Sequence, residues 1–312
     1  MSLERALELA ERGRGTTHPN PVVGAVVVRD GSVVGEGWHE RAGEPHAEVV
    51  ALEAAGERAR GATLFVTMEP CTHHGRTPPC VDRVLEARVA RVVAGSVDPH
   101  PGAGGGLDRL GAAGVEVELV DSFEARRQNE AWRTWVSLRR PFVTHKVAVT
   151  LDGRVAVPRS RWVSGEESRR LVHELRAASD AVAVGMGTVR ADAPSLDARG
   201  VGAARQPRRL AFGRGPLPEG SELELRAGDL EEELAELAAE GVQSLLLEGG
   251  PTLATAFLDA DLVDKLLVFV APVLGGSGPR FLGELRDSRP LARFAASRVG
   301  DDVLLSGYVH EP

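Results

Sequence analysis

The sequence predicts two α/β domains, and three observations support this fold class. The chain has 312 residues, which exceeds the roughly 100–200 residues of a typical domain. In each half, short apolar runs typical of strands alternate with amphipathic stretches typical of helices. A charged helical stretch, Glu124–Arg139, ends before Pro141, between the halves. We therefore expect one domain over residues 1–140 and a second over residues 141–312.

The first half is expected to contain a helix, a hairpin, and then alternating helices and strands. Residues 3–12 place apolar side chains on one face of a short helix. Asp30-Gly31 separates two apolar runs, which is a strong signal for a β-hairpin. One helix is expected to begin near His46, and Pro79 opens another. The remaining expected elements are hairpin strands at 22–28 and 32–38, strands at 62–68, 91–95 and 115–119, and a helix at 104–113.

The second half repeats the alternation of strands and helices. Helices are expected at 166–177, at 230–240 and after Pro251. Two segments rich in Gly, Pro and Arg, 200–208 and 213–220, are expected to be surface loops. The expected strands cover residues 142–150, 180–185, 209–214, 242–247, 265–271 and 303–309.

Composition narrows the classes of function. Hydrophobic residues make up 43% and charged residues 26%, as in ordinary globular proteins. The formal net charge of −8 counts against a nucleic-acid partner, because phosphate binding needs a concentrated basic surface. No apolar run reaches the roughly 18 residues of a membrane span, and the N-terminus lacks the apolar stretch of a signal peptide. We expect a cytoplasmic protein without nucleic-acid or membrane partners, and the sequence leaves open whether it forms a homo-oligomer.

The two cysteines, Cys71 and Cys80, suggest a metal site. A disulfide is not expected in a reducing compartment, so they are either metal ligands or incidental residues. Together with His46 they offer the nitrogen and sulfur ligands that zinc prefers, and three ligands leave a fourth position for water. Glu48 lies two residues beyond His46, where it can move protons at that water without binding the metal. The sequence therefore predicts a Zn²⁺ site of His46, Cys71 and Cys80, with Glu48 as the catalytic residue.

The same residues are also compatible with a structural role or with a different deaminase. Taken singly, His46 can cap a helix and the cysteines can be small core residues. A structural zinc site would need a fourth ligand, which His73 or His74 could provide. A deaminase of nucleic acid or free nucleosides, with a second half that only binds, is a further alternative. The acidic balance and the lack of a basic, aromatic-rich stripe count against nucleic acid.

The spacing of the cysteines makes the motif more specific. Eight residues separate them, where the general zinc-deaminase pattern has two. The inserted segment is Thr-His-His-Gly-Arg-Thr-Pro-Pro, and the segment His18–Gly24 has the sequence His-Pro-Asn-Pro-Val-Val-Gly. With these segments the chain resembles the bifunctional deaminase–reductases of riboflavin biosynthesis. The resemblance implies a cytidine-deaminase-like α/β/α sandwich that removes the exocyclic amine of 2,5-diamino-6-ribosylamino-4(3H)-pyrimidinone 5′-phosphate.

Several polar residues of the first half suit a pocket for this substrate. Asn20, held between two prolines, is able to hydrogen-bond a pyrimidine edge. His73, His74 and Arg76 are able to meet the substrate phosphate. A solvated loop explains these polar residues equally well.

The residue chemistry of the second half is less specific. Gly249-Gly250 lies between an apolar strand and a helix, where exposed backbone N–H groups suit a phosphate or pyrophosphate. This is not a G-x-G-x-x-G sequence, so it does not support a Rossmann site.

The resemblance continues through the second half, on the segments 146–153, 187–196 and 248–253. It implies a dihydrofolate-reductase-like α/β domain that uses NADPH to reduce the ribosyl group of the deaminated product to ribityl. The cofactor residues that it implies are Ala148, Trp162, Thr188, Asp192, Gly250, Pro251, Thr252 and Leu253. The substrate residues that it implies are Ser160, Arg176, Leu196, Arg199 and Glu248.

Physical chemistry adds two points about this reductase site. Arg176 and Arg199 suit phosphate, because planar guanidinium groups match phosphate oxygens. Lys146 and Asp152 are the proton-transfer candidates. The chain also departs from the family, since it is short after Arg199 and has Gly213-Arg214 where an Asp-Ser-like pair is usual. A monofunctional zinc deaminase with an inactive or binding-only second domain therefore stays open as an alternative.

Overall fold

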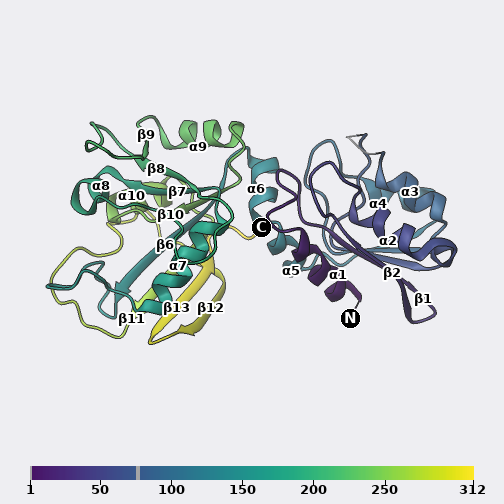
Figure 1. Cartoon of the computed structure of the whole chain (residues 1–312), viewed down its shortest axis with the longest axis horizontal. Coiled ribbons are helices and arrows are strands. Elements are labelled where there is room, and N and C mark those ends of the chain that lie inside the picture. The colour runs from purple at the N-terminus through teal and green to yellow at the C-terminus, as the bar shows by residue number, and fades with distance from the viewer. Residues whose placement is uncertain (1, 75–77) are drawn as a thin grey trace. The chain divides into compact units, whose positions relative to one another are not determined.

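The computed structural model describes residues 2–74 and 78–312 and divides into two compact units. The first unit extends to Leu138 and includes Pro312, and the second runs from Arg139 to Glu311. Both units combine helices with a β-sheet, as Figure 1 shows. The predicted fold class of two α/β domains is confirmed.

In its described residues, the first unit has a five-stranded sheet with the strand order β2-β1-β3-β4-β5. β1 is antiparallel to β2 and β3, whereas β3, β4 and β5 run parallel to one another. The strands are β1 (Gly24–Arg29), β2 (Ser32–Trp38), β3 (Thr63–Val66), β4 (Arg91–Ala94) and β5 (Glu116–Leu119). The helices are α1 (Ser2–Ala10), α2 (Ala47–Ala55), α3 (Cys80–Ala87), α4 (Gly106–Ala112), α5 (Phe123–Gln128) and α6 (Glu130–Leu138), with 3-10 turns η1 (Glu11–Gly13) and η2 (Gly56–Ala59).

Helices cover both faces of this first sheet. Leu9 of α1 packs with Val26 on one face, and Ala51 of α2 packs with Val27 on the other, where α3 and α4 also lie. Because successive residues of a strand point to opposite faces, the apolar residues of β1 serve two cores at once. The result is a three-layered α/β/α sandwich.

The second unit, whose residues are all described, has an eight-stranded sheet with the order β12-β13-β11-β6-β10-β7-β8-β9. Strands β6 to β11 are parallel, and β13 and β12 add an antiparallel edge. The strands are β6 (Phe142–Thr150), β7 (Ala181–Gly185), β8 (Arg208–Phe212), β9 (Glu224–Arg226), β10 (Ser244–Leu247), β11 (Lys265–Ala271), β12 (Ala292–Val299) and β13 (Asp302–Tyr308). The helices are α7 (Glu166–Ala178), α8 (Met186–Asp192), α9 (Leu230–Ala239) and α10 (Pro251–Asp259).

The core of the second unit also has two sides. Leu234 of α9 and Phe257 of α10 pack on one face of the central strands. Val189 of α8 and Leu175 of α7 pack on the other face. The central strands are therefore buried on both faces, which explains why they appear in the sequence as continuous apolar runs.

The structure differs from the sequence-based expectation at a few elements. The charged helical stretch 124–139 is interrupted, and α5 and α6 meet at Asn129. Asn129 accepts a hydrogen bond from Val22 N at 2.9 Å and donates one to Val22 O at 2.8 Å, so its side chain serves a tertiary contact. The sequence patterns also do not predict α8, β9 or β12. Most residues of β12 are exposed, so this strand has no alternation of buried and exposed positions.

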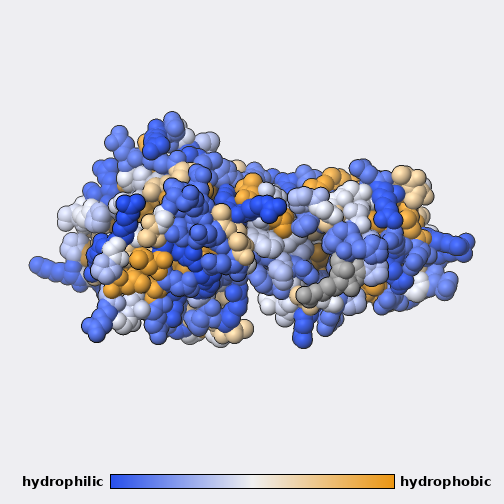
Figure 2. All heavy atoms as spheres, turned by 90° about the horizontal axis from the view of Figure 1, so that it is seen from above, coloured by the Kyte–Doolittle hydropathy of each residue, from blue (hydrophilic) through white to orange (hydrophobic). Residues whose placement is uncertain are grey.

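None of the described helices is both long enough and apolar enough to cross a bilayer. On the face seen in Figure 2, hydrophilic residues dominate and hydrophobic residues form small separate patches. Scattered patches of this kind are normal for a protein surface in water.

Candidate functional site

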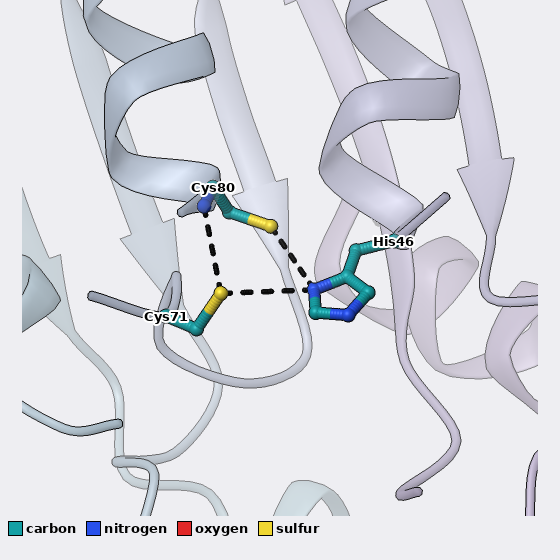
Figure 3. A group of neighbouring side chains, drawn as sticks. All are labelled: His46, Cys71 and Cys80. Atoms are coloured by element: carbon teal, nitrogen blue, oxygen red, sulfur yellow. Dashed lines mark hydrogen bonds between the residues drawn. The ribbon is translucent and has the colours of Figure 1, made fainter. Parts of the chain in front are cut away.

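His46, Cys71 and Cys80 come together from three segments of the first unit (Figure 3). His46 precedes α2, Cys71 lies on the loop after β3, and Cys80 is the first residue of α3. The Nδ1 atom of His46 lies 3.2 Å from Cys80 Sγ and 3.7 Å from Cys71 Sγ. The backbone N–H of Cys80 donates to Cys71 Sγ at 3.4 Å.

This geometry fits a zinc ion. Zinc–sulfur bonds of about 2.3 Å and zinc–nitrogen bonds of about 2.0–2.1 Å place tetrahedral ligand atoms roughly 3.5–3.8 Å apart. The three ligand atoms lie within 4.8 Å of one another. Within the described residues this group has three members and contains neither His73 nor His74. The residues therefore suit an open catalytic site better than a closed structural one.

The electrostatics of the two thiols also suit a cation. Hydrogen bonding from Cys80, together with His46, lowers the pKa of Cys71 to about 4 although burial opposes this. The pKa of Cys80 is raised, because the Cys71 sulfur lies beside it and the site is buried. A thiolate at Cys71 suits a divalent cation, and metal binding displaces protons from thiol ligands.

Close packing of α2 on β2 fixes the position of His46. A Cβ atom at Gly37 would lie 2.6 Å from Ala47 O, closer than any real contact allows. A Cβ atom at Gly35 would lie 2.2 Å from Ala51 O. These two glycines let the helix lie directly on the strand, and the first turn of α2 carries the site residues.

Glu48 lies in that first turn, and its side chain lines the cavity next to the triad. It is 3% exposed, and burial raises the pKa of its carboxyl to about 7 although His46 opposes this shift. The metal-binding group and the buried carboxyl are therefore distinct features of the structure. Glu48 stands beside the three ligands and is not one of them.

The triad opens into a cavity of about 430 Å³. Asn20 and His73, two of the predicted substrate residues, line it. Arg76 lies outside the described residues. The hydrogen-bonding side chains and the enclosed wall suit a small polar molecule.

Sequence reasoning missed several further residues of this wall, namely His39, Asp98, His100, Trp132 and Trp135. His39 is buried, its Nδ1 lies 3.1 Å from Pro45 O, and its Nε2 lies 3.2 Å from Asn20 Nδ2. If Nδ1 donates to the carbonyl, Nε2 accepts from the Asn20 amide and so orients it. The spacing of Trp132 and Trp135 on one helical face is the signal that could have revealed these two residues.

The second unit contains a larger cavity of about 1450 Å³. Five of the predicted cofactor residues line it, and so do four of the predicted substrate residues. They are Ala148, Trp162, Thr188, Asp192 and Gly250, and Arg176, Leu196, Arg199 and Glu248. Pro251, Thr252, Leu253 and Ser160 are not among the lining residues. Leu253 packs against Gly249, and Ser160 forms a turn in which its Oγ donates to Trp162 O at 2.7 Å.

Three charged, partly buried side chains form the centre of this cavity. Glu248 accepts hydrogen bonds from Arg176 Nε at 2.6 Å, Arg176 Nη2 at 3.0 Å and Lys146 Nζ at 3.0 Å. Burial would raise the pKa of Glu248, but Lys146 and Arg176 outweigh it and lower the pKa to about 2. An ionised carboxylate thus lies between two cations in a site with little solvent.

Asp152, the other proton-transfer candidate, has its carboxylate engaged by backbone N–H groups and a hydroxyl group. Its carboxylate accepts hydrogen bonds from Gly275 N at 2.7 Å, Gly276 N at 2.9 Å and Thr150 Oγ1 at 2.6 Å. These hydrogen bonds lower its pKa to about 2. Asp152 ties two loops together and does not line the cavity, whereas Lys146 does.

Two family models match the chain. The cytidine and deoxycytidylate deaminase zinc-binding region matches residues 2–96, and the RibD C-terminal domain matches residues 141–305. The two matches coincide with the parts of the chain that hold the His46 triad and the Glu248 centre. The zinc-binding group of His46, Cys71 and Cys80 lies within the first match.

Curated relatives and solved structures match over nearly the whole chain. Riboflavin biosynthesis protein RibD of Escherichia coli is 41% identical, with 97% of each chain covered, and that of Aquifex aeolicus is 40% identical, with 97% of this chain and 96% of the relative covered.

Among solved structures, Acinetobacter baumannii RibD has a TM-score of 0.84 and 35% identity, with 98% of this chain and 97% of that chain covered. A diaminohydroxyphosphoribosylaminopyrimidine deaminase/5-amino-6-(5-phosphoribosylamino)uracil reductase of Thermotoga maritima has a TM-score of 0.82 and 35% identity, with the same coverage. The chain therefore belongs to the RibD family, the bifunctional deaminase/reductases of riboflavin biosynthesis.

Proposed function

We propose that this chain catalyses two consecutive steps of riboflavin biosynthesis. The first is the zinc-dependent hydrolytic deamination of 2,5-diamino-6-ribosylamino-4(3H)-pyrimidinone 5′-phosphate. The second is the NADPH-dependent reduction of its ribosyl group to ribityl. The proposal rests mainly on one observation. His46, Cys71 and Cys80 form a three-ligand group that leaves a fourth position for water, and the buried Glu48 lines the same cavity. We assign the deaminase to residues 1–140 and the reductase to residues 141–312.

In the deaminase, His46, Cys71 and Cys80 would hold the metal. Zinc, when bound, supplies Lewis-acid activation of a water molecule. Glu48 would take a proton from the attacking water and deliver it to the leaving amine. Its buried place beside the triad keeps bulk water from competing for the proton.

Recognition of the substrate in the deaminase is assigned to three polar residues. Asn20 hydrogen-bonds the pyrimidine edge, and His39 supports this by binding the Asn20 amide. His73 and Arg76 meet the phosphate, because both side chains offer N–H donors that carry or can take a positive charge.

In the reductase, NADPH supplies a hydride when it is bound. Ala148, Trp162, Thr188, Asp192 and the turn Gly250–Leu253 are assigned to the cofactor. Ser160, Leu196 and Arg199 are assigned to the substrate, together with Arg176 and Glu248. Lys146 and Arg176 hold Glu248 as a carboxylate, so the site has a fixed anion that can accept hydrogen bonds from ribose hydroxyl groups. Arg199 has a half-exposed guanidinium that can reach a phosphate.

These substrates indicate which partners and which cellular compartment to expect. Its partners are small pyrimidine ribose phosphates, and we infer that it works in the cytoplasm without nucleic-acid or membrane partners. Whether it works as a homo-oligomer is a separate question for solution measurements.

The test is to incubate zinc-loaded protein with the diaminopyrimidine phosphate, with and without NADPH, and to analyse the products by mass. Deamination adds about one mass unit, and reduction of the ribosyl group adds about two more. Without NADPH the singly changed product is expected to accumulate. Absence of ammonia release would exclude the deaminase, and failure to oxidise NADPH with the deaminated product would leave a monofunctional enzyme.

A further inference from the structure

Residues 194–200 form an irregular part of the reductase cavity wall and carry Leu196 and Arg199. Leu196 is 2% exposed and has a φ of +53°, in the left-handed region that a leucine rarely adopts. Such a conformation persists when surrounding contacts enforce it. The position of this wall segment therefore depends on the residues that anchor it.

Two anchors hold the segment from different sides. Gln206 donates to Ala198 O at 3.0 Å and accepts from Ala198 N at 2.8 Å. The carbonyl of Asp197 is bound from α7, at 3.0 Å by His173 Nδ1 and at 3.1 Å by Arg176 Nη1. The second anchor connects the wall to the helix that also supplies Arg176.

The two donors from α7, His173 and Arg176, differ in the other hydrogen bonds that they make. Arg176 uses Nε and Nη2 for Glu248, so the arginine serves the charged centre and the wall together. His173 lies one helical turn earlier on the same face and also lines the cavity. Within the hydrogen bonds described for His173, both partners belong to the wall segment.

The protonation of His173 follows from its partners. Nδ1 lies 3.0 Å from Asp197 O, which can only accept, and 3.4 Å from Arg199 N, which can only donate, so the tautomer decides which of the two bonds forms. The shorter contact favours the tautomer with the proton on Nδ1, which donates to Asp197 O in place of accepting from Arg199 N–H. Burial, together with the nearby cations Arg176 and Arg199, lowers the pKa of His173 and so favours the neutral ring.

We propose that His173 is a positioning residue of the reductase, which fixes Leu196 and Arg199 against the phosphate end of the pyrimidine substrate by donating its Nδ1–H to Asp197 O. This inference rests on the proposed reductase activity. It assigns His173 no contact with the reacting atoms.

The test compares His173→Leu with His173→Asn in the full chain. Leucine fills much of the volume but has no donor, whereas the asparagine amide nitrogen is attached to Cγ as Nδ1 is. We expect His173→Leu to raise KM for the deaminated pyrimidine about tenfold and to change kcat less than about threefold, because one positioning hydrogen bond is lost. His173→Asn should return KM to within about threefold of the wild type.

Further readouts separate positioning from folding. The Kd for NADPH, measured by fluorescence, should be the same in all variants, and Glu174→Gln on the exposed side of α7 is the matched control. His173→Ala provides a second donor-free variant. Loss of NADPH binding, an unchanged KM in both donor-free variants, or failure of asparagine to restore KM would overturn the proposal. A wild-type chain that cannot oxidise NADPH would instead refute the proposed reductase itself.

Discussion

The two cavities hold their buried glutamates in opposite states. Burial has the largest effect on the carboxyl of Glu48 and raises its pKa to about 7. Glu248 is also largely enclosed, but Lys146 and Arg176 lower its pKa to about 2. One carboxyl is therefore able to exchange protons near neutral pH, and the other is a permanent anion. The difference comes from neighbouring cations, because burial alone favours the neutral acid in both.

Replacing Glu48 by glutamine tests the first of these roles. We expect Glu48→Gln to lower deaminase kcat by about 10²–10⁴-fold, because an amide cannot relay the proton. The zinc content, measured by elemental analysis, should stay unchanged, since Glu48 is outside the ligand group. NADPH oxidation with the deaminated substrate should also continue. Loss of bound zinc in this variant would mean that Glu48 is a ligand.

His145 of β6 is expected to make the stability of the second unit depend on pH. It is fully buried, its Nδ1 lies 3.2 Å from Leu247 O, and in the described structure its Nε2 has no hydrogen-bond partner. Burial lowers its pKa from 6.5 to about 4. The unfolded chain binds this proton below about pH 6.5 and the folded chain below about pH 4, so stability should fall between these values as pH decreases. The total loss is on the order of 3 kcal/mol.

Hydrogen exchange of β6 peptides between pH 7 and pH 5 can measure this effect. His145→Asn keeps a donor toward Leu247 O but does not titrate, so its protection should decline less over this range. The control is His310→Asn, a more exposed histidine near the end of the chain. Equal pH slopes for His145→Asn and the wild type would contradict the prediction.

At the scale of elements, the contact between α2 and β2 determines where the zinc ligands lie. A methyl group at Gly37 would be 2.6 Å from both Ala47 O and Ala51 N, which are backbone atoms that cannot move alone. We expect Gly37→Ala to push α2 away, to destabilise the first unit by about 1–3 kcal/mol, and to weaken zinc binding at least about tenfold. Zinc competition with a chromophoric chelator measures the affinity.

A second glycine in the same unit provides the control for this prediction. A Cβ atom at Gly111, inside α4, would make one ordinary contact of 3.6 Å with Val117. Gly111→Ala should leave zinc affinity unchanged and slightly raise stability, because alanine favours the helix. If Gly37→Ala bound zinc as tightly as Gly111→Ala, the close contact would not be what positions His46.

Much of the fold and of the zinc site could be predicted from the sequence, because the relevant signals are local. Pro79 before Cys80 and the spacing of His46 and Glu48 identify both the helices and the chemistry. His39 and His100 could not be predicted, since tertiary packing alone brings them to the cavity. Asp152 shows the converse, a chemically suitable residue whose carboxylate is used by backbone N–H groups of a distant loop. β12 was missed because exposure on both faces removes the alternation.

At the scale of the whole molecule, the two active sites belong to separate units with separate cores and cavities. Within the described residues, the one group able to bind a metal lies in the first unit. Metal removal should therefore distinguish the two activities on one chain. Chelation is expected to lower deaminase activity more than about 100-fold, because Glu48 alone does not supply the Lewis-acid activation of the water that zinc provides.

NADPH oxidation with previously deaminated substrate should stay within about twofold of its starting rate in the chelated protein, since hydride transfer depends on positioning of the cofactor. The measurement follows ammonia release and NADPH absorbance in parallel, before and after dialysis against a chelator. Addition of zinc should restore ammonia release, which controls for irreversible unfolding. A parallel loss of both activities that zinc restores would show instead that the reductase depends on the His46–Cys71–Cys80 site, and the independence of the two units would have to be abandoned.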